Sequence, residues 1–224
     1  MTPASPGRRP LAVHRAGLVP YAQGLSLQQD LVASRRAGLV PDTLVLLEHP
    51  HVITLGSSAD RAHVLVPDAD REAQGVELYE AGRGGDVTYH GPGQLVAYPI
   101  LDLKPDRKDL HRYLRELEEV LMRVAKTFGV ESRRREGLTG VWTDRGKLAA
   151  IGVRVSSQWI ASHGAALNVS SDLGFFDAIV PCGLQGEGVT SLEHELGGPV
   201  DMDDVAARLT EHFADVFDCD IIVA

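Results

Sequence analysis

The clearest hydrophobic pattern in the chain lies in residues 109–129, which read DLHRYLRELEEVLMRVAKTFG. Apolar residues recur there at steps of three and four, so they share one face of an α-helix. They are Leu110, Tyr113, Leu114, Leu117, Val120, Leu121, Val124 and Phe128. Asp109 is suited to cap the N-terminus of this helix, and Gly129 is placed to end it.

Two further helices are predicted, at residues 24–37, with Gly38 as the stop, and at residues 203–217. Apolar runs of strand length lie between the helices, at residues 43–49, 51–56, 94–103, 140–143, 147–155, 159–169 and 220–223. The DRG turn at residues 144–146 joins two of them as a hairpin. Helices and strands do not alternate strictly, so the pattern predicts an α/β fold of the α+β kind. Its sheet is expected to be mixed and largely antiparallel, with flanking helices.

Composition indicates an ordinary globular chain: of 224 residues, 44% are hydrophobic and 24% charged. No linker divides it, so we expect one domain at residues 13–224 after a flexible, proline-rich tail at residues 1–12. That tail lacks the apolar core of a secretory signal, and no apolar run approaches the ~20 residues of a membrane span. Two cysteines exclude a disulfide framework and favour a reducing compartment, so a cytoplasmic location is expected.

The formal net charge of −9 argues against nonspecific nucleic-acid binding, which depends on neutralising phosphates. Binding to an acidic partner would need a local basic patch instead. Arg133, Arg134 and Arg135 form one such run, and a solvated loop is the alternative interpretation.

Residues 82–93, GRGGDVTYHGPG, contain five glycines, which suggests that the backbone approaches another group closely. The segment matches neither a P-loop nor the G-x-G-x-x-G pattern, so nucleotide binding has weak support. Arg83, Thr88, Tyr89 and His90 are candidate polar contacts. A tight connection between strands is the alternative.

The two cysteines stand in different surroundings. Cys182, in IVPCGLQG, follows an apolar run and lies between Pro181 and Gly183, so a turn would present its thiol to a substrate. The amide of Gly183 could face an oxyanion. Without a nearby base, Cys182 would instead be read as a small buried hydrophobe. Cys219 lies between two aspartates in a strand pattern, and we interpret it as structural.

Lysine and histidine supply the candidate bases. Lys147 opens an apolar strand, where a lysine can lose pKa and act as a base, although a surface lysine is the commoner case. His163 and His90 are further candidates, with a backbone-satisfied core histidine as the alternative for His163. The chain has no H-E-x-x-H, no Cys-x-x-Cys, no zinc-deaminase signature and no G-x-S-x-G. Neither a metal site nor a serine nucleophile is therefore expected.

Four segments together resemble the lipoyl(octanoyl) transferase family. They are EHPHVITLG, GRGGDVTYHGPGQLVAYPI, GVWTDRGKLAAIGVRV and HGAALNVSSDLGFFDAIVPCGLQGEGVTSL, and the likeness runs from about residue 13 to the C-terminus. The resemblance implies the fold of the catalytic domains of biotin protein ligase and the lipoate ligases. It also implies a cytoplasmic acyltransferase that moves an octanoyl group from acyl carrier protein to a lysine of a lipoyl domain.

The expected acceptors are the E2 subunits of 2-oxoacid dehydrogenases and the glycine cleavage H protein. No cofactor, metal or nucleotide is required on this interpretation, neither nucleic acid nor membrane is a partner, and a monomer is expected. The family's nucleophilic cysteine falls on Cys182 and its catalytic lysine on Lys147. Its acyl-binding wall falls on Arg83, Gly84, Gly85, His90, Gly91, Gly152, His163 and Gly164.

His49 and Tyr21 match the family more loosely. Between GVRV and HG this chain has seven residues, SSQWIAS, where about six and usually an arginine are expected, so residues 156–158 receive no role.

The implied mechanism carries the octanoyl group as a thioester on Cys182, with Lys147 as the base and Gly183 as a candidate oxyanion donor. An apolar pocket would select chain length by its depth, since each buried methylene contributes ~0.8 kcal/mol. Two alternatives stay open: an ATP-dependent lipoate or biotin ligase of the same fold, and a non-catalytic relative that holds acylated domains.

Overall fold

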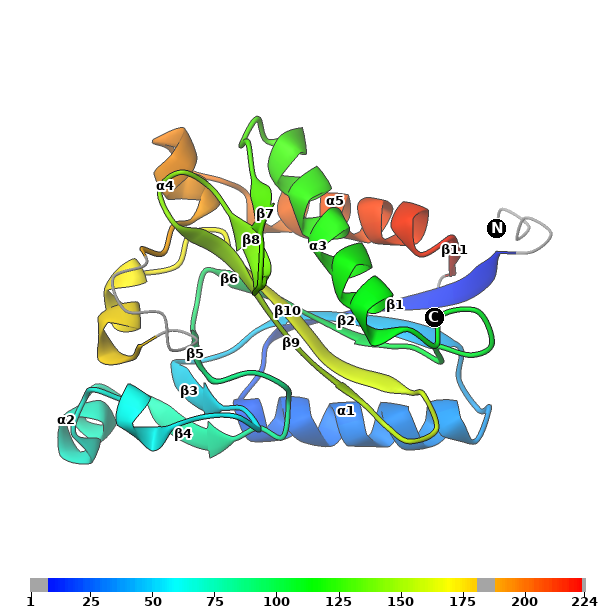
Figure 1. Ribbon diagram of the computed structural model, residues 1–224, viewed down its shortest axis with the longest axis horizontal. Helices are drawn as coiled ribbons and strands as arrows, with labels where there is room; N and C mark the ends of the chain where they lie inside the picture. The colour runs from blue at the N-terminus through cyan, green and yellow to red at the C-terminus, as the bar shows by residue number, and fades with distance from the viewer. Residues whose placement is uncertain (1–7, 181–187, 223–224) are drawn as a thin grey trace.

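The computed structural model describes residues 8–180 and 188–222, and within them the chain forms two β-sheets (Figure 1). The large sheet has eight strands in the order β11-β1-β2-β6-β10-β9-β8-β7, and the small sheet has three in the order β4-β3-β5. The strand bounds are β1 Arg9–Leu18, β2 Asp42–Glu48, β3 Val52–Leu55, β4 Glu77–Glu80, β5 Val87–His90, β6 Gln94–Ile100, β7 Arg133–Arg135, β8 Leu138–Trp142, β9 Lys147–Val155, β10 Ala161–Asn168 and β11 Cys219–Ile222.

The pairing confirms the expected mixed and largely antiparallel sheet. Only β1 pairs in parallel within the described part of the large sheet, with β11 on one side and β2 on the other. From β2 across to β7 every pairing is antiparallel. Each predicted strand is present, and residues 144–146 connect β8 to β9 as the predicted hairpin.

Helices cover both faces of the large sheet (Figure 1). Their bounds are α1 Tyr21–Arg36, α2 Asp68–Ala73, α3 Leu110–Thr127, α4 Leu192–Leu196 and α5 Met202–Val216, with short 3₁₀ turns at Arg61–His63 and Leu173–Ala178. The α1 helix lies on one face, and α3 and α5 lie together on the other. None of these described helices combines the length and the apolar character needed to cross a bilayer.

The predicted α3 helix forms as its pattern requires. Asp109 accepts a hydrogen bond from the backbone of Arg112 at 3.0 Å, and Gly129 takes a left-handed φ of 80° just past the end. The apolar stripe packs with α5 into the main core, although Leu110, its first member, is 43% exposed. The α1 helix begins at Tyr21, three residues before the predicted start.

Two expectations about loops and tails are wrong. The tail predicted at residues 1–12 overlaps β1, which begins at Arg9 and buries Leu11 completely between its two parallel neighbours. The run Arg133–Arg135 is not a solvated loop but the edge strand β7. Arg134 lies on the buried carboxylate of Glu118 at 3.0 Å, which supplies the charge partner that holds this polar strand in place.

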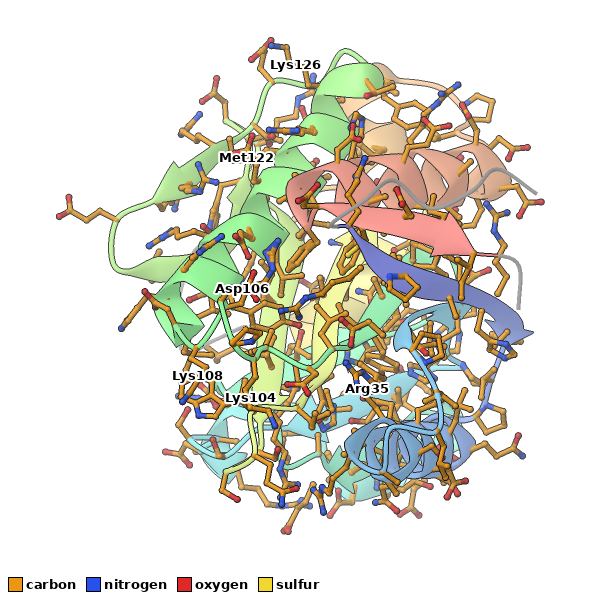
Figure 2. All side chains as sticks on the ribbon, turned by 90° about the vertical axis from the view of Figure 1, so that its right-hand side faces the viewer. Arg35, Lys104, Asp106, Lys108, Met122 and Lys126 are labelled. Carbon is orange, nitrogen blue, oxygen red and sulfur yellow. The ribbon has the colours of Figure 1, made fainter. Side chains whose placement is uncertain are left out.

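Charged side chains also tie the loop between β6 and α3 to the edge of the large sheet. That loop carries Lys104 and Asp106 at the surface (Figure 2). Arg9 of β1 donates to Asp106, and Arg35 of α1 donates from Nε to the buried carboxylate of Asp42 at 2.6 Å. These pairs compensate charges near the start of β2 and the end of β6.

Candidate active site

A small cavity, with a free volume of about 40 Å³, lies between the large sheet and the glycine-rich segment. Its walls come from five segments of the chain: the start of α1, the glycine-rich segment with β5, the middle of β6, the middle of β9, and β10. The lining residues are Tyr21, Arg83, Gly85, Asp86, Thr88, His90, Val96, Tyr98, Ala150, Ile151, Gly152, His163, Gly164, Ala165 and Ala166.

Most residues expected to bind the acyl group meet at this cavity. Arg83, Gly85, His90, Gly152, His163 and Gly164 all line it. Gly84 and Gly91 do not. The amide of Gly84 donates to the carbonyl of Val153 at 2.9 Å, which ties the segment to β9. A Cβ on Gly91 would collide with the hydroxyl of Tyr89, so Gly91 makes room for that ring.

Arg83 shapes the glycine-rich segment from inside. Its side chain is buried, and its guanidinium donates to the carbonyl of Thr54 at 2.7 Å and to the carbonyl of Asp86 at 2.9 Å. A Cβ on Gly152 would lie 3.0 Å from Arg83 Cδ, so that glycine allows the arginine to lie flat against β9. Arg83 thus brings a permanent positive charge to the cavity wall.

A chain of amide hydrogen bonds determines the protonation of His90. Asn168 donates from Nδ2 to the carbonyl of Thr190 at 3.0 Å, so its Oδ1 accepts from Nε2 of Gln94 at 2.9 Å. Gln94 Oε1 is then the acceptor 2.6 Å from His90 Nδ1, which must carry the hydrogen. Burial, and then the charge on the neighbouring His49, lower the pKa of His90 to about 3. The ring is neutral, and its Nε2 is an acceptor.

His163 is a second neutral histidine on the wall. Its backbone N–H donates to Oε1 of Gln28 on α1 at 2.7 Å, and its φ of 54° is left-handed. Burial, followed by the charges of Arg83 and Arg154, lowers the pKa of its ring to about 4, while a hydrogen bond to the backbone of Ala81 opposes this shift. The charged residues among those lining the cavity are therefore Arg83 and Asp86, and the carboxylate of Asp86 lies 2.6 Å from Nδ1 of His63.

Tyr98 and Tyr21 form the far wall, and His49 lies behind them. His49 donates from Nδ1 to the carbonyl of Val19 at 2.6 Å, so its Nε2 accepts from the Tyr98 hydroxyl at 2.7 Å. A Cβ on Gly24 would lie 2.8 Å from the His49 ring, so α1 packs closely over it. His49 supports the wall and does not line the cavity.

A β-bulge at the start of β9 determines which way Lys147 faces. In the β8–β9 pairing, Trp142 lies opposite Lys147, and the residue before Trp142 lies opposite Ala149. One step along β8 therefore corresponds to two steps along β9, so β9 contains one extra residue. Leu148 and Ala149 are consecutive, yet both pack in the core beneath α3 and α5. Lys147 therefore shares the opposite face with Trp142 and with Ala150 of the cavity wall.

The side chain of Lys147 is 7% exposed and well surrounded. Its Nζ lies 5.2 Å from the ring centroid of Trp142, and a Cβ on Gly140 would lie 2.8 Å from its Cε. Its backbone N–H donates to Gly188 at 2.8 Å, and its carbonyl accepts from Thr190 at 3.0 Å. Lys147 is thus a buried lysine in a constrained setting, not a surface lysine at a strand end.

Of the two cysteines, only Cys219 lies among the residues that the structure describes. Cys182 and Gly183, the expected nucleophile and oxyanion donor, lie outside the described residues. Cys219 is buried in β11, and burial, followed by the charge of Asp42, raises the pKa of its thiol to about 11. Such a thiol is a poor nucleophile, which confirms its structural role. Among the described residues no cluster of metal-ligating side chains is arranged to hold an ion.

Comparison with known proteins now defines the family. The model of the lipoyl protein ligase A/B catalytic domain matches residues 20–214. The chain belongs to this family. An octanoyltransferase of Rubrobacter xylanophilus is 50% identical over 201 residues, which cover 89% of this chain and 90% of the relative.

Solved structures of the family show the same fold. A lipoate protein ligase of T. acidophilum with bound lipoic acid superposes with a TM-score of 0.75 at 18% identity, over 97% of this chain and 89% of that one. Biotin protein ligase of Aquifex aeolicus gives a TM-score of 0.53 at 12% identity, over 94% of this chain and 69% of that one. The expected likeness to both ligase folds is therefore confirmed.

Sequence reasoning missed the residues that support the wall from behind. Gln28, Gln94 and Asn168 are buried amides, and they orient His163, His90 and each other. A polar amide inside an apolar run, such as Gln94 at the start of β6, was the available signal, because a buried amide requires partners.

Proposed function

We propose that this chain transfers an octanoyl group from acyl carrier protein to a lysine of a lipoyl domain. The observation that carries the proposal is the position of Lys147, which shares a sheet face with a cavity lined by glycines, alanines and neutral rings. The relative called octanoyltransferase matches the chain over almost its whole length, which supports the same reaction here.

The reaction consists of two transfers through Cys182. First, the Cys182 thiolate attacks the carbonyl carbon of the carrier thioester, the carrier thiol leaves, and the octanoyl group remains on Sγ. Next, the amine of the acceptor lysine attacks this new thioester, an amide forms, and the Cys182 thiolate leaves. The N–H of Gly183 donates to the oxyanion in both steps.

Lys147 moves the protons of this sequence. In its neutral form it accepts the proton of Cys182 and passes it to the departing carrier thiol. It then takes a proton from the acceptor amine, which can attack only as the free base. Lys147 shares a sheet face with Ala150 of the cavity wall, which supports this role.

The cavity holds the eight-carbon chain. Gly85, Gly152 and Gly164 lack side chains, so the chain lies close to backbone, and burial of each methylene contributes ~0.8 kcal/mol. Keeping His90 and His163 neutral matters here, because a charged ring would oppose entry of an apolar chain.

The protein partners are octanoyl-acyl carrier protein and lipoyl domains. Of the arginine run proposed to contact them, Arg134 is engaged with buried Glu118, whereas Arg133 pairs with Asp144, which is 90% exposed. An exposed pair contributes little and exchanges readily, so Arg133 is the contact we propose. Arg133→Ala should raise KM for the carrier and leave kcat unchanged, while an unchanged KM removes this contact.

Acyl loading tests the proposal directly. The purified protein is incubated with octanoyl-acyl carrier protein without ATP, and its mass and peptide map are recorded. We expect one octanoyl adduct on Cys182, loss of the adduct in Cys182→Ala, and normal loading in Cys219→Ala. An adduct on Cys219, or no adduct without ATP, contradicts the mechanism; the second result favours an ATP-dependent ligase.

Transfer to a lipoyl domain tests the role of Lys147. Lys147→Arg keeps a positive charge but supplies no base at neutral pH, so transfer should fall by about 10²–10⁴ as expected for loss of a general base. Circular dichroism checks that the variant is folded. Transfer near the wild-type rate in a folded variant assigns the base to another residue.

A further inference from the structure

A second hollow, of about 450 Å³, adjoins the cavity at His163. It separates α1 from the β9–β10 hairpin and the start of the glycine-rich segment. Its lining residues are Leu25, Gln28, Gln29, Val32, Ala33, Arg36, Glu80, Ala81, Gly82, Arg154, Ser156, Ile160, Ser162 and His163. Of all described residues that line either space, His163 alone lines both, so it forms the partition between them.

The partition is held from several sides. The backbone of His163 bonds to Gln28 on α1, and its ring bonds to the backbone of Ala81 on the glycine-rich side. The ring also meets Tyr98 edge to face at a centroid distance of 6.2 Å. His163 is 6% exposed, and Gln28 is 3% exposed. Contacts of its backbone and on two sides of its ring therefore make His163 a fixed part of the wall and not a mobile surface residue.

The partition stands at the end of the cavity away from Lys147. His163 pairs with Val153 on β9, six residues after Lys147, which corresponds to about 20 Å along a strand. An acyl chain attached near Lys147 and lying along Ala150 and Gly152 therefore points its methyl end toward His163. Beyond the ring, Leu25, Val32 and Ile160 offer apolar surface for a longer chain.

We infer that His163, braced by Gln28, sets the upper limit of acyl chain length, and that removing its ring joins the cavity to the second hollow. This inference rests on the proposed function. It assigns to one residue the discrimination between octanoyl and longer chains. The wild-type partition stops chains longer than the cavity by steric contact, whereas the opened partition admits them to the second hollow, where Leu25, Val32 and Ile160 supply apolar surface among polar side chains.

The test measures kcat/KM for octanoyl, decanoyl and dodecanoyl carriers. His163→Gly removes the ring and suits the left-handed φ of 54°, so the backbone should keep its course. We expect the dodecanoyl-to-octanoyl ratio of kcat/KM to rise by about tenfold or more, since single methylenes in apolar pockets give 10-fold or larger discrimination. His163→Asn, which also tolerates this φ, should open the wall less and give a smaller rise.

Ser162→Ala is the matched control, because Ser162 lines the second hollow but not the cavity and should leave the ratio unchanged. If the wild type transfers octanoyl and both folded His163 variants keep the wild-type ratio, His163 does not limit chain length. The proposed function is then unaffected. If the wild type transfers no acyl group at all, the proposed function fails instead. In that case, calorimetry measures the affinities of the wild type and of His163→Gly for free octanoic and dodecanoic acid. The same ratio of the two affinities in both proteins refutes the role of His163 in limiting chain length.

Discussion

Mild acid tests the buried environment of His163 through the stability of the fold. In the unfolded chain this imidazole takes a proton near its ordinary pKa of 6.5, whereas burial and the charges of Arg83 and Arg154 hold its pKa at about 4 in the folded chain. Between these values the unfolded state binds one proton more than the folded state. The stability is therefore complete above pH 6.5 and is lost as the pH falls toward 4.

The magnitude follows from the width of this window. A full proton of difference costs about 1.4 kcal/mol per pH unit, and the unfolded ring is only half protonated at pH 6.5, so His163 alone removes about 2 kcal/mol between pH 6.5 and 4.5. His90, whose pKa burial lowers to about 3, adds a loss of similar size over the same range. Together they remove about 4 kcal/mol, a large share of the roughly 5–15 kcal/mol of a typical domain.

Urea denaturation at pH 7.5, 6.5, 5.5 and 4.5 measures this loss, and His163→Asn isolates one histidine. Asparagine tolerates the φ of 54°, so the variant removes the titrating ring without forcing the backbone. The wild type should lose about 2 kcal/mol more than the variant between pH 6.5 and 4.5. Replacement of exposed His14 by asparagine is the control for losing any histidine. Parallel curves for wild type and His163→Asn refute the buried, neutral state of this ring.

Three substitutions test the supporting contacts. Glu118→Ala leaves the buried amide of Gly140 and the partly exposed guanidinium groups of Arg115 and Arg134 without their carboxylate. It should cost about 1–3 kcal/mol in urea denaturation, and an unchanged stability contradicts the supporting role of Glu118. Asn168→Leu breaks the amide chain to His90 and should cost about 1–3 kcal/mol for each buried group left without a partner, measured in the same way. Gly140→Ala places a methyl group against the side chain of Lys147 and should lower kcat. Gly137→Ala is the control, because Gly137 is also at positive φ but its added Cβ meets nothing within 4 Å. Equal kcat values for the two variants would show that the Lys147 side chain can move aside without loss of activity.

Sequence patterns predicted the helices and strands that are stabilised mainly by residues close together in the chain. The α3 helix carries its own amphipathic stripe, cap and stop, and β9 was located at its observed bounds. Strand β1 was missed because its stability comes from two parallel neighbours distant in sequence, and its own pattern is broken by His14 and Arg15. The edge strand Arg133–Arg135 was missed for a similar reason, since carboxylates of α3 compensate its charges.

The candidate site also has features that the sequence predicts and features that depend on distant contacts. The resemblance brought together three segments that the structure places around one cavity, although their spacing in the chain says nothing about contact. The direction of Lys147 could not be read from alternation, because an extra residue reverses it. The partition at His163 depends on Gln28, which comes from a helix 135 positions away in sequence and carries no motif.

The extra residue in β9 means that strand length, and not only residue identity, decides whether this chain can carry a base at its cavity. One residue added to β8 between Trp142 and the residue before it would pair with Leu148 and restore regular alternation, while every other amino acid stayed the same. The lysine would then turn toward the hydrocarbon layer under α3, and the amine would be lost from the chemistry without any mutation of the amine itself. A design that grafts this lysine onto a regular strand must therefore include the β-bulge as well.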